Sequence, residues 1–323
     1  MSMTEIVSLG EVYEARRIIG QYLPKTPFVS SSALSIKLDC TVYVKCENTL
    51  PTGAFKVRGG INLVSQLSEL EKRSGVIAAS TGNHAQSVAY AASLFGVKAI
   101  VCMPEGANPD KVKATRAYGA KVEFHGKDYD EARLWVEKEA KQRGYRYVHS
   151  ANEPLLIAGV GTLYLEIMEE IPDVDVILVP IGGGSGAAAA CIVAKTLNPN
   201  VKVIGVQAEN APAVYLSWKN KRLFETKYAD TFAEGLATRV PFELTFSIVS
   251  SLVDDIVLVS ETDLKQAILT LLETTRQLAE GAGAASTAAA FKLREQLRGK
   301  KVALPLTGGN LTFKTLREIL DGK

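Results

Sequence analysis

A single lysine stands in the stretch PTGAFKVRGG, residues 51–60, next to the aromatic side chain of Phe55. The residues before it, TVYVKCE, have strand propensity, and INLVSQLSELEKR after it has the apolar spacing of a helix. Lys56 therefore lies at or just beyond a turn between strand and helix, where α/β proteins build ligand sites. A lysine amine can act as a nucleophile or a base. A lysine taken at random is a solvated surface charge, so the remaining motifs must decide between the two interpretations.

The stretch PIGGGSGAAAA, residues 180–190, predicts a site for an anion. A buried apolar strand ends there, and a helix begins around Gly182, Gly183, Gly184, Ser185 and Gly186. Backbone N–H groups at such a helix N-terminus suit a phosphate. A tight turn alone needs one or two glycines, so phosphate binding is favoured. The stretch is neither a Walker A loop nor a GxGxxG dinucleotide motif, which indicates a monophosphate rather than a magnesium-bound nucleotide.

The stretch ASTGNHAQSVAYAA, residues 79–92, is a second predicted junction between a strand and a helix. The polar groups of Ser80, Thr81 and Asn83, together with N–H groups of the helix start, suit a carboxylate. Taken alone, Ser80 or Thr81 is better explained as a helix N-cap, and His84 as a capping or packing residue.

Two more turns, PLTGGN at 305–310 and LAEGAGAAS at 278–286, bring Thr307 and Glu280 next to glycines. The turns put small and polar residues at the C-terminal edges of several strands, where open α/β sheets bind ligands. A phosphate site, a carboxylate site and a reactive amine fit a pyridoxal phosphate enzyme that acts on amino acids.

Predicted strands and helices alternate along the chain, which indicates an α/β fold with largely parallel sheets. We expect residues 75–148 to form a small α/β domain. Residues 1–74 and 149–323 are expected to form a larger domain that binds the cofactor. The default ligand site is the cleft between the two, over which the small domain would close.

The composition excludes several classes of function. The 323 residues are 47% hydrophobic and 22% charged, with a formal net charge of +2, so the chain has no global attraction for nucleic acid or anionic membranes. No uncharged apolar run reaches membrane-spanning length, and the N-terminus lacks the apolar core of a signal peptide. The four cysteines form no CxxC pair and the three histidines are scattered, so we expect a reduced, cytoplasmic protein without a zinc site.

In this order and spacing, TGAFKVRG, STGNHAQ, GGGSG and TGGN resemble the motifs of fold-type II pyridoxal phosphate enzymes. The chain looks most similar to the serine/threonine dehydratases (threonine ammonia-lyases) and the serine racemases, over nearly its whole length. The resemblance implies pyridoxal 5'-phosphate as cofactor and a two-domain fold like that of the tryptophan synthase β-subunit. It also implies a homodimer or higher homo-oligomer that takes a small amino-acid substrate.

The resemblance also implies a role for each candidate residue around the cofactor. Lys56 is similar to the lysine that forms the internal Schiff base and later moves the α-proton, and Phe55 to a residue that lines the cofactor ring. Asn83 matches the asparagine that binds the 3′-oxygen of the cofactor. Thr307 stands where the family usually has a serine facing the pyridine nitrogen. A neutral hydroxyl there cannot fix a positive charge on that nitrogen, which favours elimination over transamination.

The remaining roles concern the phosphate and the substrate. Residues 182–186 match the phosphate loop, and Ser80, Thr81, Asn83 and His84 match the loop that holds the substrate carboxylate. Glu280 matches an acidic residue on the substrate side of the ring. The implied reaction removes water from L-threonine or L-serine and gives 2-oxobutanoate or pyruvate plus ammonia.

Two alternatives within the enzyme class stay open. In racemases of the family the position of Thr81 is a serine that acts as acid or base on the opposite face, whereas many dehydratases have alanine there. Thr81 keeps a hydroxyl, so a serine racemase is the alternative, and dehydration of another β-hydroxy amino acid such as hydroxyaspartate is a further one. A β-replacement enzyme such as a cysteine synthase has a different lysine motif.

Some family features are expected to be absent. Gln207, Ala211 and Ala213 stand where the ligands of a divalent metal would align, and Glu209 is out of step, so we predict no such metal. The chain ends at Lys323, which leaves no room for the C-terminal regulatory domain of biosynthetic threonine dehydratases. Two hypotheses from other classes, a ligand-sensing relative without turnover and a nucleotide-binding α/β protein, leave Lys56 without a purpose.

Overall fold

The computed structural model describes residues 7–322, and its larger sheet has six strands in the order β1-β2-β10-β7-β8-β9. Strand β1 pairs with β2 in antiparallel fashion, and every other pair in this sheet is parallel. The β2–β10 pairing joins residues 41–46 to 301–306, so the lysine motif and the TGGN turn follow neighbouring strands. The strands are β1 (Phe28–Ser30), β2 (Thr41–Cys46), β7 (Val176–Pro180), β8 (Lys202–Ala208), β9 (Asp255–Val259) and β10 (Lys301–Leu306).

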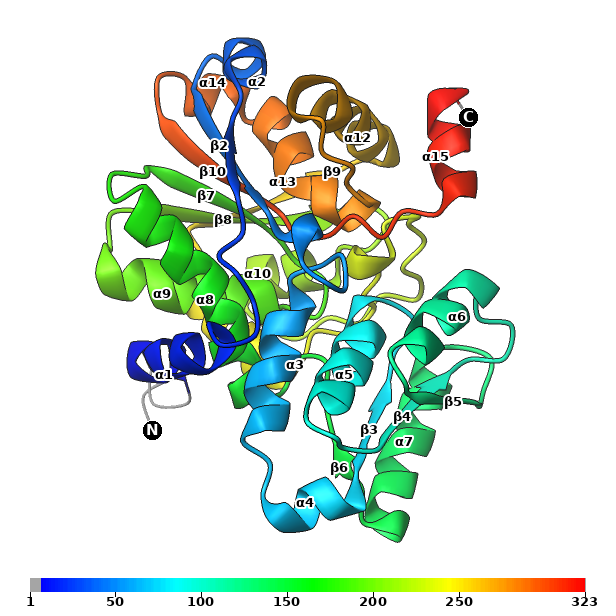
Figure 1. Cartoon of the computed structure of the whole chain (residues 1–323). Coiled ribbons are helices and arrows are strands. Elements are labelled where there is room, and N and C mark those ends of the chain that lie inside the picture. Colours follow the sequence, from blue (N-terminus) through cyan, green and yellow to red (C-terminus); the bar gives the residue numbers. More distant parts are fainter. Residues whose placement is uncertain (1–6, 323) are drawn as a thin grey trace.

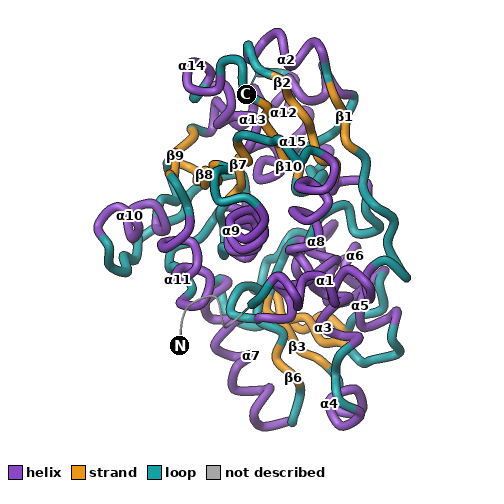
Figure 2. Tube along the Cα trace, turned by 90° about the vertical axis from the view of Figure 1, so that its left-hand side faces the viewer, coloured by secondary structure: helices purple, strands orange, loops and turns teal. Residues whose placement is uncertain are grey.

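The smaller sheet has four parallel strands in the order β5-β4-β3-β6. Helix α5 packs with Ala78 and Val101 on one face, and α7 packs with Ile77 and Ile100 on the other, as the period of two in a strand requires. Figure 1 shows this unit beside the larger one, and Figure 2 shows the two groups of strands from the side. The strands are β3 (Val76–Ala79), β4 (Ala99–Met103), β5 (Lys121–Phe124) and β6 (Arg146–Tyr147).

Helices connect the strands and cover both sheets, which confirms the predicted α/β class. None of the helices within residues 7–322 has the length and apolarity that a membrane crossing requires. The helices are α1 (Leu9–Ile19), α2 (Ser32–Leu38), α3 (Lys56–Ser65), α4 (Glu69–Ser74), α5 (Asn83–Leu94), α6 (Pro109–Ala117), α7 (Tyr129–Arg143), α8 (Pro154–Glu170), α9 (Ser185–Leu197), α10 (Ala213–Asn220), α11 (Glu243–Leu252), α12 (Glu261–Thr275), α13 (Gly281–Lys292), α14 (Arg294–Leu297) and α15 (Phe313–Leu320), with the short 3₁₀ turns η2 (Glu47–Thr49) and η3 (Glu234–Leu236).

The helix after the lysine motif differs from the expected single run over residues 61–73. Helix α3 already begins at Lys56 and ends at Ser65, and α4 starts separately with Ser68 as its N-cap. Gly59 and Gly60 therefore lie inside a helix. A Cβ at Gly59 would lie 2.7 Å from Cγ of Leu156, and one at Gly60 would lie 2.4 Å from Oγ of Ser87. These glycines allow α3 to pack closely against α8 and α5.

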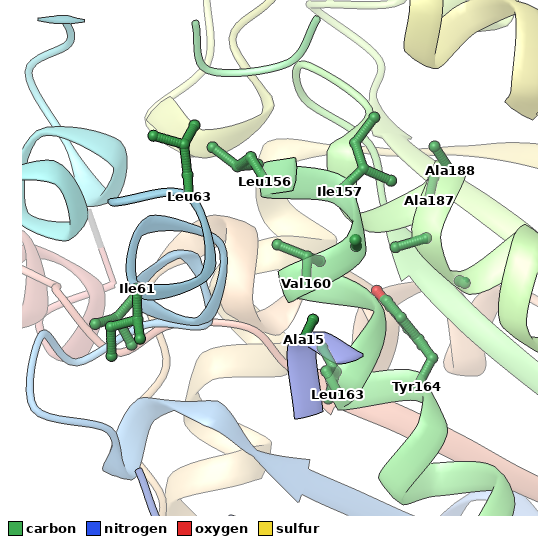
Figure 3. Packing of buried hydrophobic residues seen from close by; sticks show 14 of the residues in the cluster. Ala15, Ile61, Leu63, Leu156, Ile157, Val160, Leu163, Tyr164, Ala187 and Ala188 are labelled. Atoms are coloured by element: carbon green, nitrogen blue, oxygen red, sulfur yellow. The ribbon is translucent and has the colours of Figure 1, made fainter. Parts of the chain in front are cut away.

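The core beneath the site is built from α3, α8 and α9. Ile61, Leu156, Val160 and Ala188 are fully buried there and pack together in one cluster (Figure 3). The alanine run of α9 lets the neighbouring helix approach closely, because small side chains leave little between the two backbones. This tight packing gives the turns at the helix starts a fixed base.

Candidate active site

A cavity of about 790 Å³ opens where the turns that follow several strands meet. Its lining comes from both units of the molecule. The contributing segments include 55–56, 79–84, 110–114, 128–129, 180–186, 229–242, 280–282 and 307–315. The cavity thus gathers the four motifs singled out in the sequence, although they are up to about 250 residues apart in the chain, as binding at the strand ends of α/β sheets predicts.

Lys56 is the first residue of α3 and reaches into this cavity. Its Nζ donates hydrogen bonds to Oγ of Ser185 at 2.7 Å and to the carbonyl oxygen of Ser150 at 3.0 Å. Burial lowers the pKa of the Lys56 amine to about 8. An amine with this pKa is partly neutral near physiological pH, which suits a nucleophile and a base.

A buried ion-pair network holds the start of α3 in place. The guanidinium of Arg58 pairs with Glu47 at 2.7 Å and with Glu166 at 2.7 Å, and Lys45 pairs with Glu166 at 2.5 Å. All four side chains are at most 7% exposed. Removing one partner would leave a buried charge uncompensated, so the network resists rotation or displacement of α3 and keeps Lys56 directed at the cavity.

The glycine turn before α9 limits the argument that a tight turn alone needs only one or two glycines. Gly184 has φ +88°, which favours glycine, and a Cβ at Gly182 would lie 1.9 Å from the carbonyl oxygen of Gly235. Two of the four glycines are therefore required by the fold itself. Gly183 and Gly186 are less crowded, with no atom closer than 3.3 Å to a built Cβ, and both line the cavity.

Helix α9 begins without a side-chain hydrogen bond at its N-cap, Gly184. Its first N–H groups thus have no capping side chain, and the positive end of the helix dipole faces the cavity lining. This arrangement can bind a phosphate.

The turn before α5 corrects the N-cap interpretation of Ser80 and Thr81. The N-cap residue is Gly82, which provides no side chain, and Oγ of Ser80 accepts a hydrogen bond from the Gly82 N–H at 3.2 Å. The first N–H groups of α5 are therefore also left without a capping side chain beside the cavity. Ser80, Thr81, Gly82 and Asn83 all line it, as a carboxylate site requires.

Asn83 connects this turn to two distant segments. Its Nδ2 donates to Oε1 of Glu280 at 2.6 Å, and its Oδ1 accepts from Nδ2 of Asn310 at 2.7 Å. Burial raises the pKa of the Glu280 carboxyl to about 7, while the hydrogen bond from Asn83 acts in the opposite direction. Glu280 can therefore exchange a proton near neutral pH.

His84, Phe55 and Thr307 complete the set of predicted residues on the cavity lining. Nε2 of His84 lies 3.0 Å from the carbonyl oxygen of Val148, and burial lowers the pKa of its imidazole to about 3, so the ring is neutral. The Nζ of Lys56 lies 5.4 Å from the centroid of the Phe55 ring. Thr307 is buried, and its hydroxyl is 3.5 Å from the carbonyl oxygen of Ala282.

Tyr129, Ser150 and Tyr164 line the cavity but carried no signal in the sequence. Tyr164 looks like one more apolar residue of a buried helix, and Tyr129 like an ordinary residue of a charged helix. The Oη of Tyr129 lies 3.4 Å from Oγ of Ser150, whose carbonyl oxygen accepts the bond from Lys56. The small unit thus reaches the reactive amine through Ser150. Only the tertiary packing brings these residues together.

Residues 207–215, at the end of β8 and beyond, are the segment that we expect to lack a metal site. Gln207 is buried, and its Oε1 accepts the N–H of Tyr215 at 2.9 Å, while Ala211 and Ala213 are buried in the fold. Among the described residues, no group of three or more His, Cys, Asp or Glu side chains could hold a metal ion.

The comparisons with known proteins match nearly the whole chain. Residues 19–308 match the family described as pyridoxal-phosphate dependent enzyme. An L-threonine ammonia-lyase from Thermotoga maritima is 41% identical over 316 residues, which are 98% of this chain and 79% of that protein. The protein named L-threonine dehydratase catabolic TdcB from Staphylococcus aureus is 39% identical over 325 residues, 99% of this chain and 94% of that protein. Maize serine racemase superposes with a TM-score of 0.93 at 28% identity, covering 98% of each chain.

Proposed function

The chain belongs to the family of pyridoxal-phosphate dependent enzymes, and on that premise we propose that it eliminates water from L-threonine, L-serine or both. The released enamine then takes up one water molecule and hydrolyses, so the final products are 2-oxobutanoate or pyruvate, plus ammonia. The observation that carries the proposal is the amine of Lys56, which is desolvated and directed between two uncapped helix starts. The two helix starts suit the two anionic groups that such an enzyme must hold, a phosphate and a carboxylate.

The residues around the cavity fit pyridoxal phosphate. In the cradle of residues 183–186, Gly183 and Gly186 leave space on the cavity lining that side chains would fill, beside the uncapped N–H groups of α9. Phe55 and Thr307 line the cavity, where Phe55 would lie against the cofactor ring and Thr307 would offer a neutral hydroxyl to the ring nitrogen. When bound, the cofactor supplies an electron sink for the charge left behind by a departing α-proton.

The side chains of this protein then divide the work. Ser80, Thr81 and Asn83, with the N–H groups of α5, hold the substrate carboxylate and so orient the α-carbon. Lys56 Nζ takes the α-proton as a neutral amine, which the lowered pKa of that amine favours. Loss of the β-hydroxyl as water completes the elimination. The buried Glu280 carboxyl, whose pKa is raised to about 7, would hold a proton on the substrate side.

A second candidate function is racemisation of serine. Thr81 carries a hydroxyl on the α5 turn and lines the cavity, and as an acid or base it could act on the face of the α-carbon away from Lys56. Hydroxyaspartate and other β-hydroxy amino acids are further candidate substrates, since segment 232–242 contributes much of the lining and its side chains would meet the β-substituent.

We also propose how the whole molecule is arranged in use. Residues 75–148 would act as the small domain that closes over the substrate, and residues 1–74 with 149–323 as the cofactor-binding domain. The separate four-stranded sheet of β3 to β6 supports this division. The ion pair of Lys111 with Glu234 and the hydrogen bond from Tyr118 Oη to the Pro51 carbonyl oxygen at 2.7 Å connect the two units. A cytoplasmic homodimer is proposed from the family likeness and the unpaired buried cysteines.

The test is release of 2-oxo acid by the purified, cofactor-loaded protein with L-threonine and with L-serine. Rapid 2-oxobutanoate formation is expected. Lys56→Ala should lower turnover by more than about 10³-fold because the proposed base for the elimination is lost, and it should abolish the visible absorbance of the lysine-linked cofactor. Normal turnover by that variant would refute the assignment. No oxo acid from either amino acid, with D-serine formed from L-serine, would favour the racemase.

A further inference from the structure

The buried hydroxyl of Tyr164 has no hydrogen-bond partner within residues 7–322. The side chain is 0% exposed, and its Oη makes no hydrogen bond with any described residue. Buried hydroxyls in proteins are nearly always hydrogen-bonded, so such an exception calls for an explanation. A phenylalanine would fill the same space in α8 without burying a polar atom.

The hydroxyl points at the glycine cradle. A Cβ built on Gly186 would lie 3.4 Å from Oη of Tyr164 and 3.6 Å from the ring of Phe55. Tyr164 and Gly186 both line the cavity. Figure 3 shows the ring of Tyr164 extending from α8 with its oxygen at the end nearer Ala187, in the first turn of α9. The hydroxyl therefore reaches the N-terminal turn of α9 from α8, next to the space that Gly186 leaves because it has no side chain.

The chemistry of the group matches that place. Burial raises the pKa of the Tyr164 hydroxyl well above its usual value, with smaller contributions from Glu47 and Cys191, so it keeps its proton and acts as a donor. The nearby N–H groups of α9 lack a capping side chain, and Oγ of Ser185 is 2.7 Å from Lys56 Nζ. The cradle thus presents donors from the backbone on one side and from Tyr164 on the other, an arrangement that suits a multiply charged anion.

We propose that Tyr164 is a cofactor-binding residue whose hydroxyl donates a hydrogen bond to the phosphate group of pyridoxal phosphate. The inference rests on the proposed position of that phosphate in the 182–186 cradle. It adds a ligand from α8, a helix that none of the sequence motifs includes. Tyr164 acts on the phosphate and not on the reacting atoms, so it positions the cofactor.

The experiment compares a ligand that has the phosphate with one that lacks it. Cofactor-free protein is titrated with pyridoxal phosphate and with pyridoxal, and binding is followed by the visible absorbance of the lysine-linked ligand. Tyr164→Phe should weaken pyridoxal phosphate binding by roughly ten- to a hundredfold, the usual value of a hydrogen bond to a charged group, and leave pyridoxal binding unchanged. Tyr215→Phe, which removes a hydroxyl on α10 outside the cavity, is the matched control and should change neither affinity.

A second variant, Ser185→Ala, tests the hydrogen bond from Tyr164 separately from the proposed position of the phosphate in the cradle. Ser185→Ala should also weaken pyridoxal phosphate more than pyridoxal, because Ser185 lies in the cradle. If Ser185→Ala discriminates between the two ligands and Tyr164→Phe does not, the role of Tyr164 is refuted and the cradle stands. If neither variant discriminates between the two ligands, neither side chain donates to the phosphate, and the role of Tyr164 is refuted. An equal loss of both affinities in Tyr164→Phe would assign the hydroxyl to the fold alone and also refute the inference.

A stability measurement checks the folded state of the variant. Tyr164→Phe should melt no lower than the parent protein without cofactor, because the substitution removes a buried, unpaired hydroxyl. With saturating pyridoxal phosphate the parent should gain more in melting temperature than the variant, since tighter binding stabilises the native state further. A variant that gains as much as the parent would contradict the proposal.

Discussion

The two helix starts that face the cavity are built in opposite ways. At the start of α9, a Cβ on Gly182 would lie 1.9 Å from the backbone oxygen of Gly235, so that turn is packed against η3 without space to move. At the start of α5, a Cβ on Gly82 would meet no atom within 4 Å. The α9 turn is fixed by backbone contacts, whereas the α5 turn is open and connected to its surroundings through the side chain of Asn83.

The difference fits what each turn is proposed to hold. A resident phosphate gains from a site that is already in its bound geometry, because no ordering cost is paid when it binds. A substrate that enters and leaves needs a turn that can adjust. The turn at Gly82 has that space, although the rest of α5 packs closely on α3 where Gly60 meets Ser87. Rigidity and adaptability thus belong to different turns.

The largest expected effect comes from a pair of matched glycine substitutions. Gly182→Ala should lower the free energy of unfolding by about 3 kcal/mol or more, because backbone atoms must move to admit the methyl group. A shift of about 1 Å in the α9 turn should also cost on the order of a hundredfold in turnover. Gly82→Ala should change the free energy of unfolding by less than about 0.5 kcal/mol and leave cofactor affinity intact. Urea unfolding and cofactor titration measure both.

Equal destabilisation by the two substitutions would remove the distinction between a rigid and an open turn. A higher KM of Gly82→Ala for the amino acid, with unchanged cofactor affinity, would sharpen this distinction. The α5 turn would then affect substrate binding and not cofactor binding.

The sequence was informative where function depends on local features. Strand, small polar turn and helix follow each other within a few residues, so the turns around Lys56, Asn83, Ser185 and Thr307 could be predicted. Their convergence on one cavity follows from the rule that parallel strands present their carboxyl ends at one edge.

The features that were missed depend on contacts between distant segments. Gly59 and Gly60 look like helix breakers, yet α3 runs through them because close packing against Leu156 and Ser87 excludes larger side chains. Tyr164 cannot be told from a packing residue until its hydroxyl is found without a partner beside Gly186. Neither feature has a local signature, so periodicity and propensity could not reveal it.

A smaller effect concerns the proton on Glu280, which links the α5 turn to α13. Because burial raises the folded-state pKa of this carboxyl to about 7, the native protein binds its proton more tightly than the unfolded chain does. Its contribution to stability is complete below the unfolded pKa of about 4.5 and is lost as the pH rises to 7. Between these pH values the parent protein should lose on the order of 3 kcal/mol of its free energy of unfolding through this carboxyl, and Glu280→Gln should not show that loss.

Urea unfolding of the cofactor-free protein at pH 5 and pH 8 measures the contribution of Glu280 to the free energy of unfolding. The parent protein should lose more stability between the two values than Glu280→Gln does. Glu170→Gln, which changes an exposed carboxylate at the end of α8, is the control and should behave like the parent. Identical pH dependence in all three proteins would show that Glu280 does not exchange a proton in this range.

The smallest effect expected on elimination comes from Thr81, on the open turn. If this hydroxyl serves mainly the opposite face of the α-carbon, Thr81→Ala should keep 2-oxo acid release within about threefold, because Lys56 still removes the proton and the N–H groups of α5 still hold the carboxylate. If the parent protein converts L-serine to D-serine, Thr81→Ala should lower the rate of that conversion by about a hundredfold, because a general acid or base is lost. Thr81→Ser keeps a hydroxyl and should restore the rate. The two products, pyruvate and D-serine, are measured in the same reaction. A large loss of pyruvate formation in Thr81→Ala would instead place the hydroxyl in the elimination itself. The α5 turn would then have to hold a reacting group as firmly as the α9 turn is proposed to hold a phosphate.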